Sequence, residues 1–272
     1  MRESPKLNPS LQRQIDLPFF DAHHREIRSD LHTWASNHIT HATFDESLVD
    51  AHCQGLVKLL GNAGWFRHAI AGIESGGATQ TIDTRSICLI REELAWHSGL
   101  ADFVFAMQGL GSGAISLFGS EAQKKHYLPQ VASGMSIAAF ALSEPHAGSD
   151  VAAMSCSAEA DGDHFIINGE KTWISNGGIA NFYVVFARTN EAPKAKGISA
   201  FIVDADTKGL QIAERIEVIA PHPLARLRFD NVRIPKSHRI GAGGAGFKVA
   251  MATLDVFRTS VAAAALGFAR RA

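Results

Sequence analysis

Apolar positions follow a helical period through the first half of the chain. Ile87, Ile90 and Leu94 recur at i, i+3 and i+7, with charged residues between them. The segment 45–60 has the same period and ends at glycines, which often terminate helices. Residues 100–118 are almost uncharged, so we expect them to form a buried central helix, followed by a short amphipathic helix over 121–131.

The pattern changes to short β-rich runs between about residue 137 and residue 234. Turn signals such as Asp161-Gly162, Asn168-Gly169 and Lys208-Gly209 separate these runs. The strands are predicted at 137–142, 155–160, 164–168, 171–175, 182–188, 199–204, 210–216 and 225–229. Strands without helices between them favour an antiparallel barrel or sandwich. Helices, then strands, then a helix define an α+β fold class.

A final helix follows the glycine-rich segment 241–246. We expect one apolar stripe to be buried along it, comprising Phe247, Met251, Leu254, Arg258, Val261, Ala265 and Phe268. A charge on such a stripe requires an anion, so Arg258 pairs with Asp255 or with a bound ligand. The glycines also match G-x-G-x-x-G, but no βαβ pattern surrounds them and we reject a dinucleotide-binding motif.

Charge and composition exclude several classes of function. The net charge is -1, which gives no basic field for nucleic acid or an anionic membrane. The 13 histidines are scattered without a metal-ligand spacing, so no metal site is predicted. Three isolated cysteines suggest free thiols in a reducing compartment. The first 14 residues lack the apolar core of a signal peptide, and no long uncharged apolar run occurs, so we expect a cytoplasmic protein without a membrane span.

Two polar segments carry candidate chemistry. In AFALSEPHAGSDVAAM (139–154), a strand leads into a loop with Ser143, Gly148 and Ser149, whose hydroxyl and backbone donors suit an anionic or polar ligand edge. An ordinary loop capped by Asp150 is the alternative. In KTWISNG (171–177), Trp173 and a hydroxyl two residues later share one side of a strand, which suits a flat ring, although a core tryptophan is the alternative.

FALSEPHAGSDV followed by NGEKTWISNG resembles the paired signatures of the acyl-CoA dehydrogenase family, and the likeness extends from about residue 16 to Arg258. The resemblance implies a middle β-barrel and FAD as cofactor. It implies FAD contacts at Phe140, Leu142, Ser143, Gly148, Ser149, Trp173, Ile174 and Ser175. Ser149, Asp255 and Arg258 would contact the CoA substrate. Serine replaces the commoner threonine at 143 and 175, which keeps the hydroxyl, and His146 replaces a small residue.

The resemblance also implies three domains: residues 1–134 helical, 135–236 the β-barrel, and 237–272 the first helix of an incomplete C-terminal helical domain. The family removes the substrate α-proton with a glutamate, usually from that C-terminal domain. A minority of members carry it at the position of Phe257, which cannot accept a proton. Glu74, Glu92 and Glu93 have no motif support as a base. We therefore expect the chain to stop before the base.

The predicted function is FAD-dependent α,β-dehydrogenation of an acyl-CoA thioester, with this chain inactive by itself. An electron-transfer flavoprotein would accept the electrons, and a homo-oligomer or a complementing C-terminal chain would complete the site. Two alternatives remain open. One is a non-catalytic subunit that binds flavin or CoA, consistent with Phe257. The other is an acyl-CoA oxidase or flavin hydroxylase of the same architecture.

Overall fold

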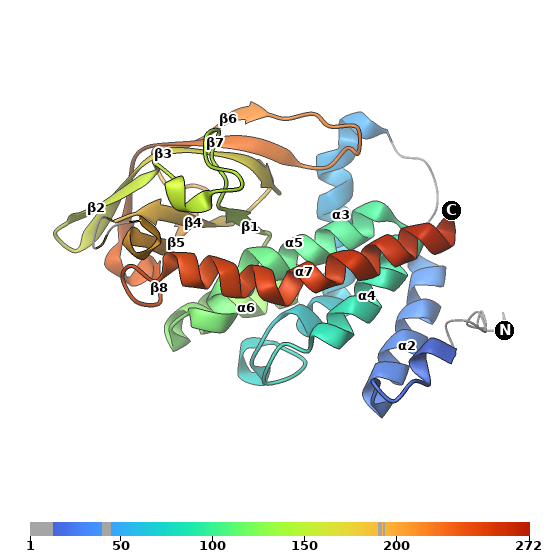
Figure 1. Ribbon diagram of the computed structural model, residues 1–272. Coiled ribbons are helices and arrows are strands. Elements are labelled where there is room, and N and C mark those ends of the chain that lie inside the picture. Colours follow the sequence, from blue (N-terminus) through green and yellow to red (C-terminus); the bar gives the residue numbers. More distant parts are fainter. Residues whose placement is uncertain (1–12, 40–44, 190–191, 193) are drawn as a thin grey trace.

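Helices flank an eight-stranded sheet in the computed structural model, which describes residues 13–39, 45–189, 192 and 194–272 (Figure 1). The α-helices are α2 (Ala22–His38), α3 (Val49–Asn62), α4 (Thr84–His97), α5 (Gly99–Phe118), α6 (Glu121–Ala132) and α7 (Gly246–Arg271). Short 3-10 turns link several of them. The predicted absence of a signal peptide concerns a segment that lies largely outside the described residues.

Polar side chains fix where three of these helices begin. Asp83 accepts a hydrogen bond from the Arg85 N–H at 3.0 Å at the start of α4, and Ser98 accepts one from Ala101 at the start of α5. Ser120 and Gln123 exchange side-chain and backbone hydrogen bonds at the start of α6. Each cap satisfies backbone donors that the first turn leaves without a helical partner.

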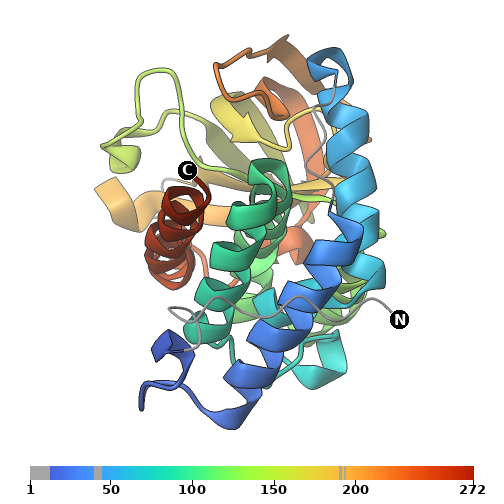
Figure 2. The same cartoon turned by 90° about the vertical axis from the view of Figure 1, so that its right-hand side faces the viewer.

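The helices form a layer with α4 and α5 at its centre. Figure 2 shows α7 on one side of this pair and α2 and α3 on the other, with the sheet above. The predicted burial of α5 at the centre is confirmed, because 78% of an 18-residue apolar stretch of this helix is buried. By length and composition alone, α5 and α7 could each cross a membrane, but burial of this extent identifies α5 as a core helix of the protein.

The strands form one sheet in the order β6-β7-β3-β2-β4-β5-β8, with β1 added beside β4. Their bounds are β1 (Ala138–Ala141), β2 (Ser157–Asp161), β3 (His164–Ser175), β4 (Phe182–Arg188), β5 (Ile198–Asp204), β6 (Leu210–Arg215), β7 (Leu224–Pro235) and β8 (Arg239–Ile240). The mixture of helix and sheet is confirmed. The antiparallel barrel is not: β1 and β2 run parallel to β4, and no ladder joins β6 to β8 within the described residues.

One predicted turn is part of a strand. Asn168-Gly169 was expected to separate two strands, but both lie within β3, where the register against β7 shifts between Ile167 and Gly169. Gly169 has φ +139°, and a Cβ there would lie 2.7 Å from the Cα of Cys156. Glycine therefore permits a β-bulge and a close approach to the neighbouring chain. The predicted strand at 182–188 is confirmed with the same bounds.

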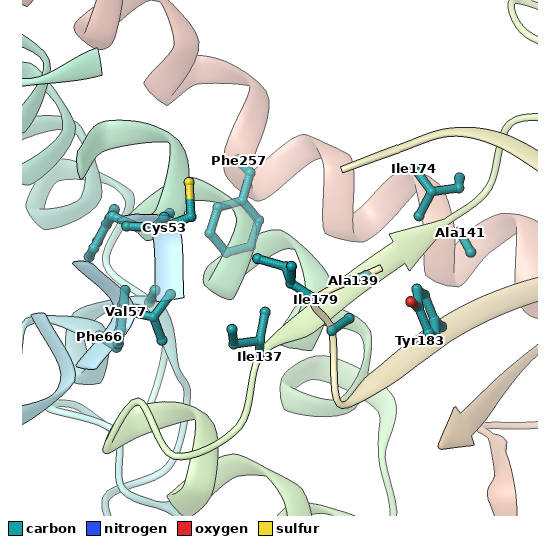
Figure 3. Close-up of a cluster of buried hydrophobic side chains, with 14 of the residues drawn as sticks. Cys53, Val57, Phe66, Ile137, Ala139, Ala141, Ile174, Ile179, Tyr183 and Phe257 are labelled. Atoms are coloured by element: carbon teal, nitrogen blue, oxygen red, sulfur yellow. The ribbon is translucent and has the colours of Figure 1, made fainter. Parts of the chain in front are cut away.

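A continuous apolar core joins the helical layer to the sheet. Cys53 and Phe66 from the helical part lie in the same buried cluster as Ile137 and Tyr183 from the sheet part (Figure 3). Burial of these side chains is the main favourable term holding the two layers together. Cys53, Cys88 and Cys156 are all free thiols, as predicted.

Candidate functional site

A cavity of about 540 Å³ lies where the first polar loop, the end of β3 and two helices meet. The loop and strand residues in its lining include all eight predicted cofactor contacts: Phe140, Leu142, Ser143, Gly148, Ser149, Trp173, Ile174 and Ser175. Met107 and Leu110 of α5 and Phe247, Met251 and Leu254 of α7 add an apolar wall. The volume falls within the roughly 300–1,000 Å³ that small-molecule sites usually have.

The two polar segments are joined directly. The Thr172 N–H donates to the Ser143 carbonyl oxygen at 2.9 Å, which holds the loop against β3. Trp173 follows with φ +59°, at a register shift between Lys171 and Ile174 that takes it out of the ladder with β7. Trp173 is 60% exposed, so the alternative of a core tryptophan is wrong. An indole in this position can cover the face of a flat ligand.

A buried ion pair that the sequence reasoning missed supports this loop. Lys171 is fully buried, and its Nζ donates to the Glu144 carboxylate at 2.8 Å and to the Leu142 carbonyl at 3.0 Å. Glu144 also accepts hydrogen bonds from the backbone N–H groups of Ser155 and Cys156. Burial alone would raise the pKa of Glu144, but the Lys171 charge and these hydrogen bonds outweigh it and lower the pKa.

Glu144 directly follows the predicted contact Ser143 in the first motif, and Lys171 lies two residues before the predicted contact Trp173 in the second. Their positions inside the motifs were the available signal, but nothing in the spacing shows that side chains 27 residues apart meet. Leu142, whose carbonyl Lys171 binds, lines the cavity. The pair therefore holds the loop in position through the backbone of Leu142, and neither Lys171 nor Glu144 lines the cavity.

The predicted buried stripe of α7 is wrong. The buried residues are Gly246, Val249, Ala250, Thr253, Phe257, Ser260, Ala264 and Gly267. Most of them are small because α7 lies close to α4: a Cβ on Gly267 would be 2.2 Å from the Glu92 carbonyl oxygen. Of the larger apolar side chains, Phe257 is buried, whereas Val261, Leu266 and Phe268 are exposed. Phe247, Met251 and Leu254 of the predicted stripe are half-buried along the cavity.

Asp255 and Arg258 do not lie in the cavity. Their side chains are 66% and 59% exposed, and Arg258 Nη2 lies 2.5 Å from Asp255 Oδ1. Arg258 is therefore not a buried charge that requires a ligand, and the local partner is sufficient. Their role as substrate contacts stays a prediction.

Phe257 points into the core. It is 5% exposed and extends from α7 toward α5, among the labelled apolar side chains of Figure 3. Cβ atoms placed on Gly109 and Gly113 would lie 2.5 Å and 3.0 Å from its ring, so these glycines make room for it. Asp150 is the one carboxylate in the described lining of the cavity, and it is exposed.

A second cavity, of about 700 Å³, lies at the start of α5 and shares Met107 with the first. Its lining includes Arg91 and Asp102, whose side chains form two 2.8 Å hydrogen bonds. Burial raises the pKa of Asp102 even though Arg91 opposes this shift. The second cavity thus continues the apolar wall of the first along α5 toward a polar end.

The helical layer and the sheet thus enclose a cavity whose aromatic and hydroxyl-bearing lining suits a flat, polar-edged ligand. The family models for the acyl-CoA dehydrogenase N-terminal domain and middle domain match residues 21–135 and 139–232. A probable acyl-CoA dehydrogenase of Mycobacterium tuberculosis is 40% identical over 268 residues, 97% of this chain and 67% of that protein. The chain thus spans about two thirds of the length of this relative.

Solved structures agree with this likeness. A chain from a structure of the electron transferring flavoprotein of Acidaminococcus fermentans is 33% identical with a TM-score of 0.84, covering 93% of this chain and 66% of that one. An acyl-CoA dehydrogenase complexed with FAD from Bacillus anthracis is 30% identical with a TM-score of 0.80, covering 93% and 44%. This chain belongs to the acyl-CoA dehydrogenase family. Enzymes of this family are oxidoreductases that act on CH–CH groups.

Proposed function

We propose that this chain binds FAD in the cavity of about 540 Å³ and takes part in the α,β-dehydrogenation of an acyl-CoA thioester. One observation carries the proposal: all eight residues expected to contact FAD line this one cavity, although they come from two separate segments. Trp173 would cover the ring face, and the hydroxyls of Ser143 and Ser175 would bind its polar edge. The relative from Bacillus anthracis with bound FAD supports the choice of cofactor.

The acyl group would lie along the apolar wall of α5 and α7. When bound, FAD supplies the acceptor for the hydride that leaves the substrate β-carbon. Leu110, Met251 and Leu254 would exclude water from the reacting carbons and hold them against the ring face. Ser149 would lie near the CoA chain, with Asp255 and Arg258 outside the cavity on the path of the nucleotide.

A carboxylate must remove the α-proton, and Phe257 does not provide one. We infer that this base lies neither at the α7 position nor at Asp150, which lines the cavity but is exposed and has no motif support. An electron-transfer flavoprotein is the proposed acceptor of the electrons. The buried Phe257 favours a second candidate function, a non-catalytic flavin- and CoA-binding subunit.

Titration of the purified protein with FAD tests the cofactor site. We expect saturable binding with quenching of flavin fluorescence, and Trp173→Leu should weaken it by roughly 2- to 13-fold because a ring contact contributes about 0.5–1.5 kcal/mol. Trp96→Leu, on α4 outside the cavity lining, is the matched control and should bind FAD as the wild type does. Absence of saturable FAD binding in the wild type would refute the proposal.

A CoA thioester added without oxygen to the FAD-bound protein separates the candidate functions. Bleaching of the flavin absorption indicates a dehydrogenase, and rapid return of the colour in air indicates an oxidase or hydroxylase. A flavin that stays oxidised while the thioester binds indicates the non-catalytic subunit.

A further inference from the structure

Three metal-ligating side chains converge between α2 and α4, away from the FAD cavity. His32 lies on α2, whereas Glu93 and His97 lie one turn apart on α4. His32 Nδ1 is 2.8 Å from Glu93 Oε1, and His97 Nε2 is 3.3 Å from the same oxygen. The three ligand atoms all lie within 4.8 Å of one another. The side chains of His32, Glu93 and His97 are only 13%, 3% and 1% exposed.

Glu93 is held in the orientation that a metal ligand needs. Arg28 Nη1 donates to the other carboxylate oxygen, Oε2, at 3.1 Å, which leaves Oε1 facing the two imidazoles. A carboxylate fixed by an outer hydrogen bond is the usual support for a metal ligand.

We propose that His32, Glu93 and His97 bind one divalent transition-metal ion, with zinc preferred, that cross-links α2 to α4. Two imidazoles and one carboxylate form a common zinc ligand set, and ligands at about 2.0–2.2 Å from zinc lie roughly 3.3 Å apart. The distances from Glu93 Oε1 already approach this value. A water molecule would take the fourth coordination position of zinc. His97 also lines the cavity of about 700 Å³.

Two features set the expected strength of binding. The ring centroids of His32 and His97 are 6.3 Å apart, so His32, the most exposed of the three, must move toward the ion. Arg28 repels a cation, although Glu92 and Glu93 balance the charges of Arg28 and Arg270. We therefore expect a dissociation constant on the order of micromolar, weaker than that of closed structural zinc sites.

The same contacts also describe a metal-free cluster in which His32 hydrogen-bonds to Glu93 and His97 lies against the same carboxylate oxygen, so the variants must separate the two states. Asparagine places its amide nitrogen near the position of histidine Nδ1, and glutamine places its own near Nε2. His32→Asn and His97→Gln therefore each place an amide donor near Glu93 while removing the imidazole ligand. A network alone would tolerate both changes, whereas a metal site would not.

A second cluster provides the control. Asp21, His23 and His24 also lie within reach of one ion. His24 accepts a hydrogen bond from the Asp21 N–H at 3.0 Å, and its other nitrogen lies 2.7 Å from Asp83, so both ring nitrogens are engaged. His23→Gln removes the exposed imidazole of that cluster and should leave metal uptake unchanged.

Zinc titration by calorimetry tests the site on tag-free protein that a chelator has stripped of metal, with cobalt absorption to report tetrahedral geometry. The wild type and His23→Gln should bind one equivalent, and His32→Asn and His97→Gln should each bind about 100-fold more weakly. Circular dichroism checks that all four proteins are folded. Lack of saturable zinc uptake by the wild type overturns the proposal. So does wild-type affinity for zinc in both His32→Asn and His97→Gln, or a loss of affinity confined to His23→Gln. None of these outcomes depends on FAD.

Discussion

The residues that shape the cavity of about 540 Å³ include two that do not line it. Lys171 and Glu144 are both buried, and their 2.8 Å contact is the only charge pairing for either side chain among the described residues. Removing one partner leaves the other charge buried, which costs far more than the net contribution of the intact pair. The loop from Leu142 to Cys156 depends on this pair for its position.

Lys171→Met should lower the free energy of unfolding by about 3–5 kcal/mol, measured by urea denaturation, because Glu144 is left ionised in the core. The double variant Lys171→Met/Glu144→Gln should recover part of this loss, since no buried charge remains. FAD affinity should fall in both variants because the Leu142 carbonyl loses its donor. Equal and additive losses from the two changes would show that the pair does not interact in this way.

At the scale of elements, α5 illustrates how glycine sets the distance between layers. A Cβ on Gly111 would lie 2.7 Å from the backbone of Ala138 in β1, so only glycine allows this approach. Gly55 in α3 has no atom within 4 Å of the position that a Cβ would take. The two glycines therefore allow a matched comparison within helices.

Gly111→Ala should destabilise the protein by about 1–3 kcal/mol, because α5 must shift away from β1. Gly55→Ala should stabilise it by about 0.5–1 kcal/mol, because alanine restricts the unfolded chain and meets no obstacle. Thermal or urea unfolding measures both. Effects of the same sign would mean that helix propensity, rather than the contact with β1, governs position 111.

Local patterns predicted most elements but not which face each one buries. The α5 helix and the strand at 182–188 follow from runs of apolar residues. Such runs indicate a buried segment whatever element packs against it. The α7 stripe failed because small residues at Ala250, Ser260 and Gly267 allow close helix contact, and hydrophobicity alone does not reveal this. The open sheet depends on the order of its strands, which local spacing does not encode. The His32–Glu93 contact joins side chains 61 residues apart, which local spacing does not encode either.

At the scale of the whole molecule, Gln108 ties the helical layer to the sheet. This buried side chain of α5 accepts a hydrogen bond from the Ala138 N–H at 2.9 Å and donates to the Ser136 carbonyl at 2.8 Å. Together with the shared apolar core, this contact predicts that helices and sheet unfold as one cooperative unit.

Gln108→Leu should lower stability by about 2–4 kcal/mol, because two buried backbone groups lose their partners. Gln130→Leu, at an exposed position on α6, should change stability by less than about 0.5 kcal/mol. Urea unfolding followed by tryptophan fluorescence and by circular dichroism should give coincident transitions for the wild type. Separate transitions would show that the two layers are energetically independent.

The left-handed backbone at Trp173 has an evolutionary consequence. A bulky side chain at φ +59° strains the main chain, and glycine would relieve this strain while little burial would be lost from a largely exposed residue. Selection for thermal robustness alone would thus tend to replace the indole. A lineage that retains tryptophan here is under selection for what the ring contacts, so drift at this codon offers a simple genetic sign that ligand binding has been abandoned.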